Sequence, residues 1–140
     1  MKGDIIPDNN NIARLCKPST IDNGQIQAPA FFLGPKEDSL SVNWLEFLKC
    51  TNREREITII REIYSQKLIV SEKAKVAILN VGKIRKNVRT FSTDHRNLGV
   101  LHDPLDIDPS HSGIYNLKQK EQLIAELILE TVLEAYPARK

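Results

Sequence analysis

Two histidines and three aspartates crowd into positions 102–111 of the 140-residue sequence. Imidazole and carboxylate groups carry out general acid–base catalysis. Together they also suit zinc or manganese, whereas aspartates alone suit magnesium. The segment therefore contains a candidate catalytic set, His102, Asp103, Asp108 and His111. It also contains a candidate set of metal ligands, His102, Asp106 and His111.

The spacing of these residues matches no established catalytic or metal-binding motif. The chain has no His-Glu-x-x-His sequence, no Cys-x-x-Cys pair and no EF-hand loop. A structural interpretation competes with the catalytic one, because Asp-Pro steps build turns and Asp103 and Asp108 can bond to the backbone of their own loop. Ser110 beside His111 does not indicate a catalytic triad, since adjacent side chains rarely face each other. No cofactor is predicted, and a divalent metal stays open as an alternative.

A second candidate site is the basic stretch before this loop. Residues 67–100 hold eight Lys or Arg and two Asp or Glu, although the whole chain carries a net charge of +2. The densest part is a predicted short helix with four positive side chains, Lys83, Arg85, Lys86 and Arg89. Such a helix can neutralise nucleic-acid phosphates or dock an acidic protein. Phe91 is the segment's only Phe, Tyr or Trp, so stacking on bases is poorly supported.

Apolar patterning predicts the strands that must position these residues. Five are expected, near Ile12, Ile26, Leu40, Val76 and Val100. The first ends at Pro18 and is placed at an edge, and the second contains Pro29 and is placed at an edge or a bulge, because proline cannot donate to a sheet. The continuous apolar run 75–81 predicts a strand buried on both faces at the centre of the sheet.

Two longer helices complete the expected fold. Thr51 begins a capping-box pattern, and the apolar positions behind it recur at helical spacing, so a helix starts there. Asn116 is a suitable N-cap for a final helix that Pro137 stops. Leu129 and Leu133 make that helix apolar over more surface than packing on one sheet requires. This width predicts contact with a partner chain or a second copy.

These elements predict one domain of the α+β class, with a small mixed or antiparallel sheet and the two main helices packed on one face. The domain spans residues 12–140 and follows a polar leader at residues 1–11. No apolar run reaches the ~20 residues of a membrane span, and the leader lacks the apolar core of a signal peptide. The cytoplasm is therefore the expected location, with Cys16 and Cys50 as reduced thiols.

Four stretches resemble a group of small uncharacterised bacterial proteins: Arg14-Leu-Cys-Lys-Pro18, Leu40-Ser-Val-Asn-Trp-Leu-Glu46, Ala77-Ile-Leu-Asn-Val-Gly82 and Asp108-Pro-Ser-His-Ser-Gly-Ile114. The resemblance covers most of the chain from about Ile12. It implies a bacterial, single-domain, intracellular protein. No activity is associated with that group, so the resemblance assigns no role to any residue.

The sequence favours a small intracellular binding or adaptor protein that works as a component of a larger bacterial assembly, a defence-related one among the options. The wide apolar face of the final helix and the segregated charge support this prediction. The alternative is a hydrolytic enzyme that acts on nucleic acid or nucleotide through the loop between His102 and His111. The expected partner is a protein or a second copy held by the final helix, with nucleic acid as a further option and no membrane.

Overall fold

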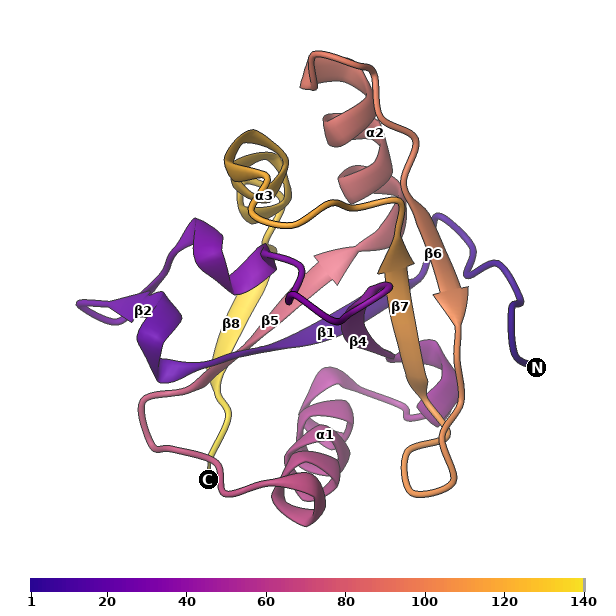
Figure 1. Ribbon diagram of the computed structural model, residues 1–140. Coiled ribbons are helices and arrows are strands. Elements are labelled where there is room, and N and C mark those ends of the chain that lie inside the picture. The colour runs from indigo at the N-terminus through magenta and orange to yellow at the C-terminus, as the bar shows by residue number, and fades with distance from the viewer. Residues whose placement is uncertain (140) are drawn as a thin grey trace.

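The computed structural model describes residues 1–139, and its centre is a six-stranded antiparallel sheet (Figure 1). The strands lie in the order β6–β7–β4–β1–β5–β8. Their bounds are β1 Asn11–Cys16, β4 Leu40–Trp44, β5 Lys75–Asn80, β6 Gly99–His102, β7 His111–Tyr115 and β8 Glu134–Pro137. A separate two-stranded hairpin consists of β2 Ile21–Asp22 and β3 Gln25–Ile26.

Within the described residues, three α-helices and three short 3-10 helices pack around the sheet. Their bounds are α1 Arg53–Lys67, α2 Val81–Phe91, α3 Gln122–Leu129, η1 Pro18–Thr20, η2 Ala28–Phe31 and η3 Glu46–Leu48. α1 covers one face, whereas α2, α3 and η2 cover the other (Figure 1). This arrangement confirms the predicted α+β fold with an antiparallel sheet. None of these helices is long and apolar enough to cross a bilayer.

The alternation of side chains along β5 creates a separate core on each face of the sheet. Val76 and Ile78 pack with α1, and Ala77 and Leu79 pack with α2 and α3. All four are fully buried, as the continuous apolar run predicts. The two helices that share a face are therefore α2 and α3. The helix after Thr51 and the final helix lie on opposite faces instead.

α1 begins next to the predicted capping box. The Asn52 side chain accepts a hydrogen bond from the Arg55 amide at 2.9 Å, so the N-cap is Asn52 rather than Thr51. Ile60 and Tyr64 follow on one helix face at the spacing i, i+4, and both are buried against the sheet. This contact fixes the C-terminal end of α1 over β4, where it contributes to a polar cluster described below.

The structure corrects two predictions that rested on prolines. β1 lies in the middle of the sheet, between β4 and β5, and not at an edge. Pro18 comes after the strand, so its missing amide hydrogen removes no ladder bond. The strand near Ile26 has only two residues and stays outside the main sheet. Pro29 lies in the first turn of η2, where a proline is readily accommodated.

The predicted final helix from Asn116 to Pro137 is wrong in extent. Asn116 adopts a left-handed turn with a φ of 75°, and the helix that follows, α3, has eight residues. The chain leaves α3 after Leu129, and residues 134–137 form β8 on the free edge of β5. The Leu133 amide donates to the Ile78 carbonyl oxygen at 2.8 Å and starts this pairing. Satisfying the edge of a buried strand therefore outweighs the helical pattern.

The polar leader is also part of the sheet region. The Ile6 amide donates to the Val100 carbonyl oxygen at 3.0 Å, and the His102 amide donates to the Asp4 carbonyl oxygen at 2.9 Å. Ile6 itself is buried. These bonds cover the outer edge of β6. Both cysteines are free, with Cys16 buried in the core.

Candidate functional site

The segment rich in histidine and aspartate forms the β6–β7 hairpin. His102 ends β6 and His111 begins β7. Between them, Leu105 and Asp108 form an isolated bridge in which each backbone amide donates to the other residue's carbonyl oxygen at 3.1 Å. Asp106 is exposed at the tip. The segment is therefore an ordered extension of two strands, and the strand geometry decides which side chains can meet.

His102 and His111 point to opposite faces of the sheet. His102 pairs with Ser112, the neighbour of His111, and consecutive residues of a strand alternate between faces. The His102 ring is buried and packs edge-on against Trp44, with ring centroids 5.2 Å apart. Its Nε2 lies 2.8 Å from the Pro109 carbonyl oxygen. The two imidazoles do not share a site.

The candidate metal ligands are likewise kept apart. Asp106 is exposed at the hairpin tip, and the other two, His102 and His111, lie on different faces. Within residues 1–139, no three His, Cys, Asp or Glu side chains are arranged to hold a metal ion. The three candidate ligands therefore do not come together in the structure, because strand alternation separates residues that lie close along the chain.

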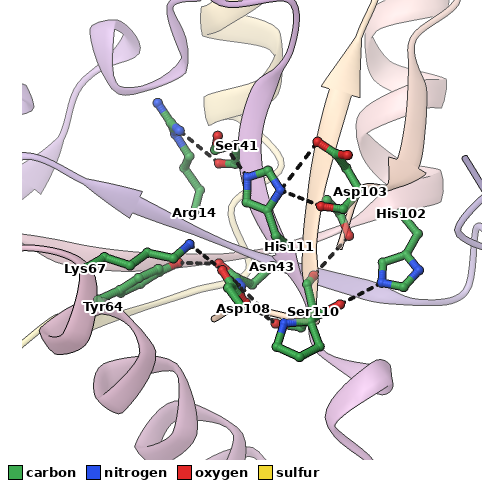
Figure 2. Close-up of polar contacts among 12 residues, drawn as sticks. Arg14, Ser41, Asn43, Tyr64, Lys67, His102, Asp103, Asp108, Ser110 and His111 are labelled. Carbon is green, nitrogen blue, oxygen red and sulfur yellow. Dashed lines mark hydrogen bonds and ion pairs between the residues drawn. The ribbon is translucent and has the colours of Figure 1, made fainter. Parts of the chain in front are cut away.

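Asp108 is the centre of a buried polar cluster, shown in Figure 2. The Asn43 amide donates to its two carboxylate oxygens at 2.8 and 2.9 Å, and the Ser110 hydroxyl donates at 3.0 Å. The Lys67 ammonium, at the end of α1, forms an ion pair with the same carboxylate. The Tyr64 hydroxyl donates to the Asn43 side-chain oxygen at 3.2 Å. We call these five residues the Asp108 cluster.

The charges of the Asp108 cluster are balanced inside the protein. Burial alone would raise the pKa of Asp108, but hydrogen bonds from Lys67 and Asn43 outweigh it and hold the pKa below its ordinary value. Burial raises the pKa of Tyr64, which stays neutral. Among residues 1–139, no buried side-chain nitrogen or oxygen lacks a hydrogen-bond partner. The cluster therefore ties the hairpin to β4 and α1, and its polar atoms are used within the fold.

His111 belongs to a second cluster, which we call the His111 cluster and which consists of Ser41, Asp103 and His111. The imidazole Nε2 lies 3.2 Å from the Ser41 hydroxyl oxygen, and Nδ1 lies 2.8 Å from the Asp103 carbonyl oxygen (Figure 2). The Asp103 carboxylate is 3.6 Å from Nδ1. The His111 side chain is 12% exposed and that of Asp103 23%, so the cluster reaches the surface.

Of the candidate catalytic residues, Asp103 and His111 thus meet each other, while His102 and Asp108 each lie elsewhere. Ser41 of the His111 cluster and Asn43 of the Asp108 cluster were not predicted as site residues from the sequence. A signal for both was present, because Ser41 and Asn43 occupy alternate positions between apolar residues of one strand. Alternation of this kind indicates a polar sheet face. It does not show which distant side chains share that face.

The four basic residues of α2 do not form one surface. Arg85 forms an ion pair with Asp8 at 2.8 Å and donates to the Leu98 carbonyl oxygen at 3.0 Å, so its charge serves the fold. The other three are exposed and form no ion pair with any part of the chain that the structure describes; they are Lys83, Lys86 and Arg89. Their charges are available to a partner.

A groove of about 460 Å³ lies between α2 and the turn after α3, and we call it the α2 groove. Lys83, Lys86 and Phe91 line it from α2, and Leu133 lines it from the turn. Phe91 is 63% exposed and Leu133 45%, so both present apolar surface to solvent. Leu129, the other predicted contact, packs against the core instead. Two features predicted separately, the basic helix and Leu133, therefore meet in one groove.

No protein-family model, curated protein or solved structure matches this chain. The described side chains are therefore the basis on which a function can be proposed. The α2 groove combines available positive charge with exposed apolar side chains. The His111 cluster combines a hydroxyl with a positioned imidazole.

Proposed function

We propose that this protein is a small intracellular binding protein that acts as an adaptor in a larger bacterial assembly, and that its partner docks in the α2 groove. The observation that carries the proposal is the meeting of Lys83 and Lys86 with Phe91 and Leu133 in one groove. A partner that covers the exposed apolar side chains removes them from water. This burial stabilises the complex by about 25 cal/mol per Å² of apolar surface. The two lysines then select the partner by charge.

The partner that fits this groove is an acidic amphipathic protein segment. Its apolar side chains would cover Phe91 and Leu133, and its carboxylates would meet the ammonium groups of Lys83 and Lys86 at the same time. An amphipathic helix laid in an apolar groove is a common way to present both kinds of group. The mixed lining of the groove supports such a segment over one that is only charged or only apolar.

The pairing of Arg85 within the fold favours an acidic protein over nucleic acid as the partner. Arg85, which could extend a phosphate-binding row along α2, is held by Asp8 and Leu98. The exposed positive charge is therefore concentrated beside an apolar surface instead of spread along a strip.

The proposal can be tested with two helical peptides that share the same leucine positions and differ in having glutamate or lysine on the polar face. We expect the glutamate peptide to bind, as followed by fluorescence anisotropy. Leu133→Asp should weaken that binding at least tenfold, about 1.4 kcal/mol. Reversing both Lys83 and Lys86 to Glu should weaken it and reduce its salt dependence.

The matched control reverses two exposed lysines outside the groove, Lys17 and Lys36, which changes the net charge by the same amount. This variant should bind the glutamate peptide as the unmodified protein does. Failure of the glutamate peptide to bind at all would overturn the proposal. So would binding of random duplex or single-stranded DNA that the Lys83 and Lys86 reversals abolish, because the groove region would then be a nucleic-acid site.

A further inference from the structure

The His111 cluster brings together a hydroxyl, an imidazole and an acidic residue from three separate places in the sequence. Ser41 comes from β4, His111 from β7, and Asp103 directly follows β6. Strand pairing places His111 beside Asn43 and on the same face as Ser41, the face that carries α1. The order of groups is hydroxyl, imidazole, carboxylate, as in serine-dependent acyl transfer.

The hydrogen bonds of His111 determine which nitrogen carries the proton. The Asp103 carbonyl oxygen, 2.8 Å from Nδ1, can only accept, so Nδ1 is the protonated nitrogen of the neutral ring. Nε2 therefore presents a lone pair, and the Ser41 hydroxyl at 3.2 Å donates to it. This arrangement allows Nε2 to remove the hydroxyl proton. The Asp103 carboxylate, 3.6 Å from Nδ1, stabilises the positive ring that results.

Solvent exposure distinguishes the His111 cluster from the other pair of a hydroxyl and a carboxylate in the hairpin, Ser110 and Asp108. Ser110 donates a hydrogen bond to Asp108, but the two residues are 1% and 0% exposed, and Lys67 of α1 pairs with Asp108. Ser41 is half-buried, and both of its partners in the His111 cluster are partly exposed. The His111 cluster is therefore partly exposed at the surface, whereas the Ser110–Asp108 pair is not.

We infer that Ser41 is a nucleophile that hydrolyses acyl esters, with His111 as the general base and Asp103 as its positioning residue. The Ser41 oxygen attacks the ester carbonyl carbon while its proton passes to His111 Nε2. The tetrahedral intermediate then releases the alcohol, which takes that proton. Water, deprotonated by Nε2, then attacks the acyl-serine. The bond between the acyl carbon and the Ser41 oxygen breaks, Ser41 takes the proton from Nε2 and the carboxylic acid leaves, so one ester and one water give one acid and one alcohol.

The surroundings of Ser41 favour an uncharged acyl group over a phosphodiester. Within residues 1–139, no Lys or Arg side chain donates a hydrogen bond to the Ser41 hydroxyl or the His111 ring, and the Arg14 guanidinium beside Ser41 donates to the Ala30 and Ser41 carbonyl oxygens, at 3.1 and 2.9 Å. The Asp103 carboxylate lies 3.6 Å from the ring and repels phosphate, although it also pairs with the exposed Lys2 ammonium at 3.7 Å. The hydrolytic alternative to a binding role is therefore directed here to neutral esters and not to nucleic acid or nucleotide.

The experiment uses the full-length protein and a fluorophosphonate probe, which transfers its phosphonyl group to an activated serine with loss of fluoride. Peptide mass spectrometry should find the adduct on Ser41. Ser41→Ala should abolish it, and His111→Asn should slow labelling about 100-fold. Hydrolysis of p-nitrophenyl acetate should fall to the uncatalysed rate in Ser41→Ala. Asp103→Asn should have a smaller effect, because the backbone carbonyl that holds Nδ1 is kept.

The matched control is Ser39→Ala, which removes a half-buried hydroxyl two residues away that makes no bond to His111. It should leave labelling within about twofold of the unmodified protein, a difference of about 0.4 kcal/mol. Absence of an adduct on Ser41 in the unmodified protein would overturn the inference, whatever the variants do. Equal ester hydrolysis by the unmodified protein and Ser41→Ala would overturn it as well, because the hydroxyl would then do nothing.

Discussion

The β6–β7 hairpin and the α2 groove differ in how much of their chemistry is already used inside the protein. The hairpin holds the conspicuous residue types, yet His102 and Asp108 are buried and bonded within the fold. The groove is built from ordinary residues, yet Lys83 and Lys86 are exposed and unpaired within the described chain, beside Phe91. The proposed binding surface therefore rests on side chains that are still available, and not on the density of reactive residue types.

The physical reason is the cost of exchanging partners. A buried carboxylate that already accepts several hydrogen bonds must lose them before it can bind anything else, and an unpaired buried charge is expensive. An exposed lysine can exchange water for a partner's carboxylate without breaking any bond inside the fold, and covering an exposed phenyl ring removes apolar surface from water, which is favourable. The His111 cluster lies between these extremes, because its groups are positioned but still partly exposed.

The largest effect is expected when the Asp108 cluster is broken. Asp108→Ala removes the partner of Lys67 and leaves the buried Asn43 amide with the Ser110 hydroxyl oxygen as its remaining acceptor. We expect the free energy of unfolding to fall by roughly 3 kcal/mol, as for other buried ion pairs that lose one member. Urea denaturation measures the change. Asp106→Ala, at the exposed tip of the same hairpin, should stay within about 0.5 kcal/mol. Equal losses in the two variants would contradict the comparison.

A part of that stabilisation should depend on pH. The pKa of Asp108 is lower in the folded protein than in the unfolded chain, so its charge stabilises the fold above the unfolded value and this contribution is lost as the pH falls through the folded value. The difference in unfolding free energy between the unmodified protein and Asp108→Asn should therefore shrink as the pH decreases from about 5 towards 2. Other carboxylates are common to both proteins and cancel. A constant difference across this range would show that the charge of Asp108 does not stabilise the fold.

The smallest expected changes in the free energy of unfolding distinguish two adjacent basic residues of α2. Arg85→Gln loses the ion pair to Asp8 and the bond to Leu98, and should reduce the free energy of unfolding by about 1 kcal/mol. Lys86→Gln loses no contact within the protein and should change it by less than about 0.5 kcal/mol. Binding of the glutamate peptide should respond in the opposite order. Thermal denaturation and anisotropy on the same two variants test both statements.

Local sequence patterns were sufficient to predict several helices and strands. The apolar run of β5 determined a strand buried on both faces, and the helical spacing after Thr51 determined α1 to within one residue of its cap. The basic helix α2 was also predicted from its own residues. Each of these features depends on neighbours within one or two turns, or on alternation along one strand, so the chain contains the required information locally.

The end of the chain shows where local information fails. The residues around Leu133 have a helical pattern, but they leave the helix to pair with β5, whose edge lies more than fifty positions earlier in the chain. The hydrogen bonds of a buried strand edge outweigh the small helix propensity of a few residues. As a result, Leu133 faces the α2 groove and Leu129 faces the core, although the sequence placed both on one surface.

The same division applies to the candidate sites. The sequence by itself determined that His102, Asp103, Asp108 and His111 lie close together along the chain and that α2 is basic. Only the tertiary structure decided that His111 meets Ser41, that Asp108 meets Lys67, and that Lys83 shares a groove with Leu133. The physical reason is strand register: pairing between distant strands sets which side chains share a face, and a shift of one residue would reverse every such contact.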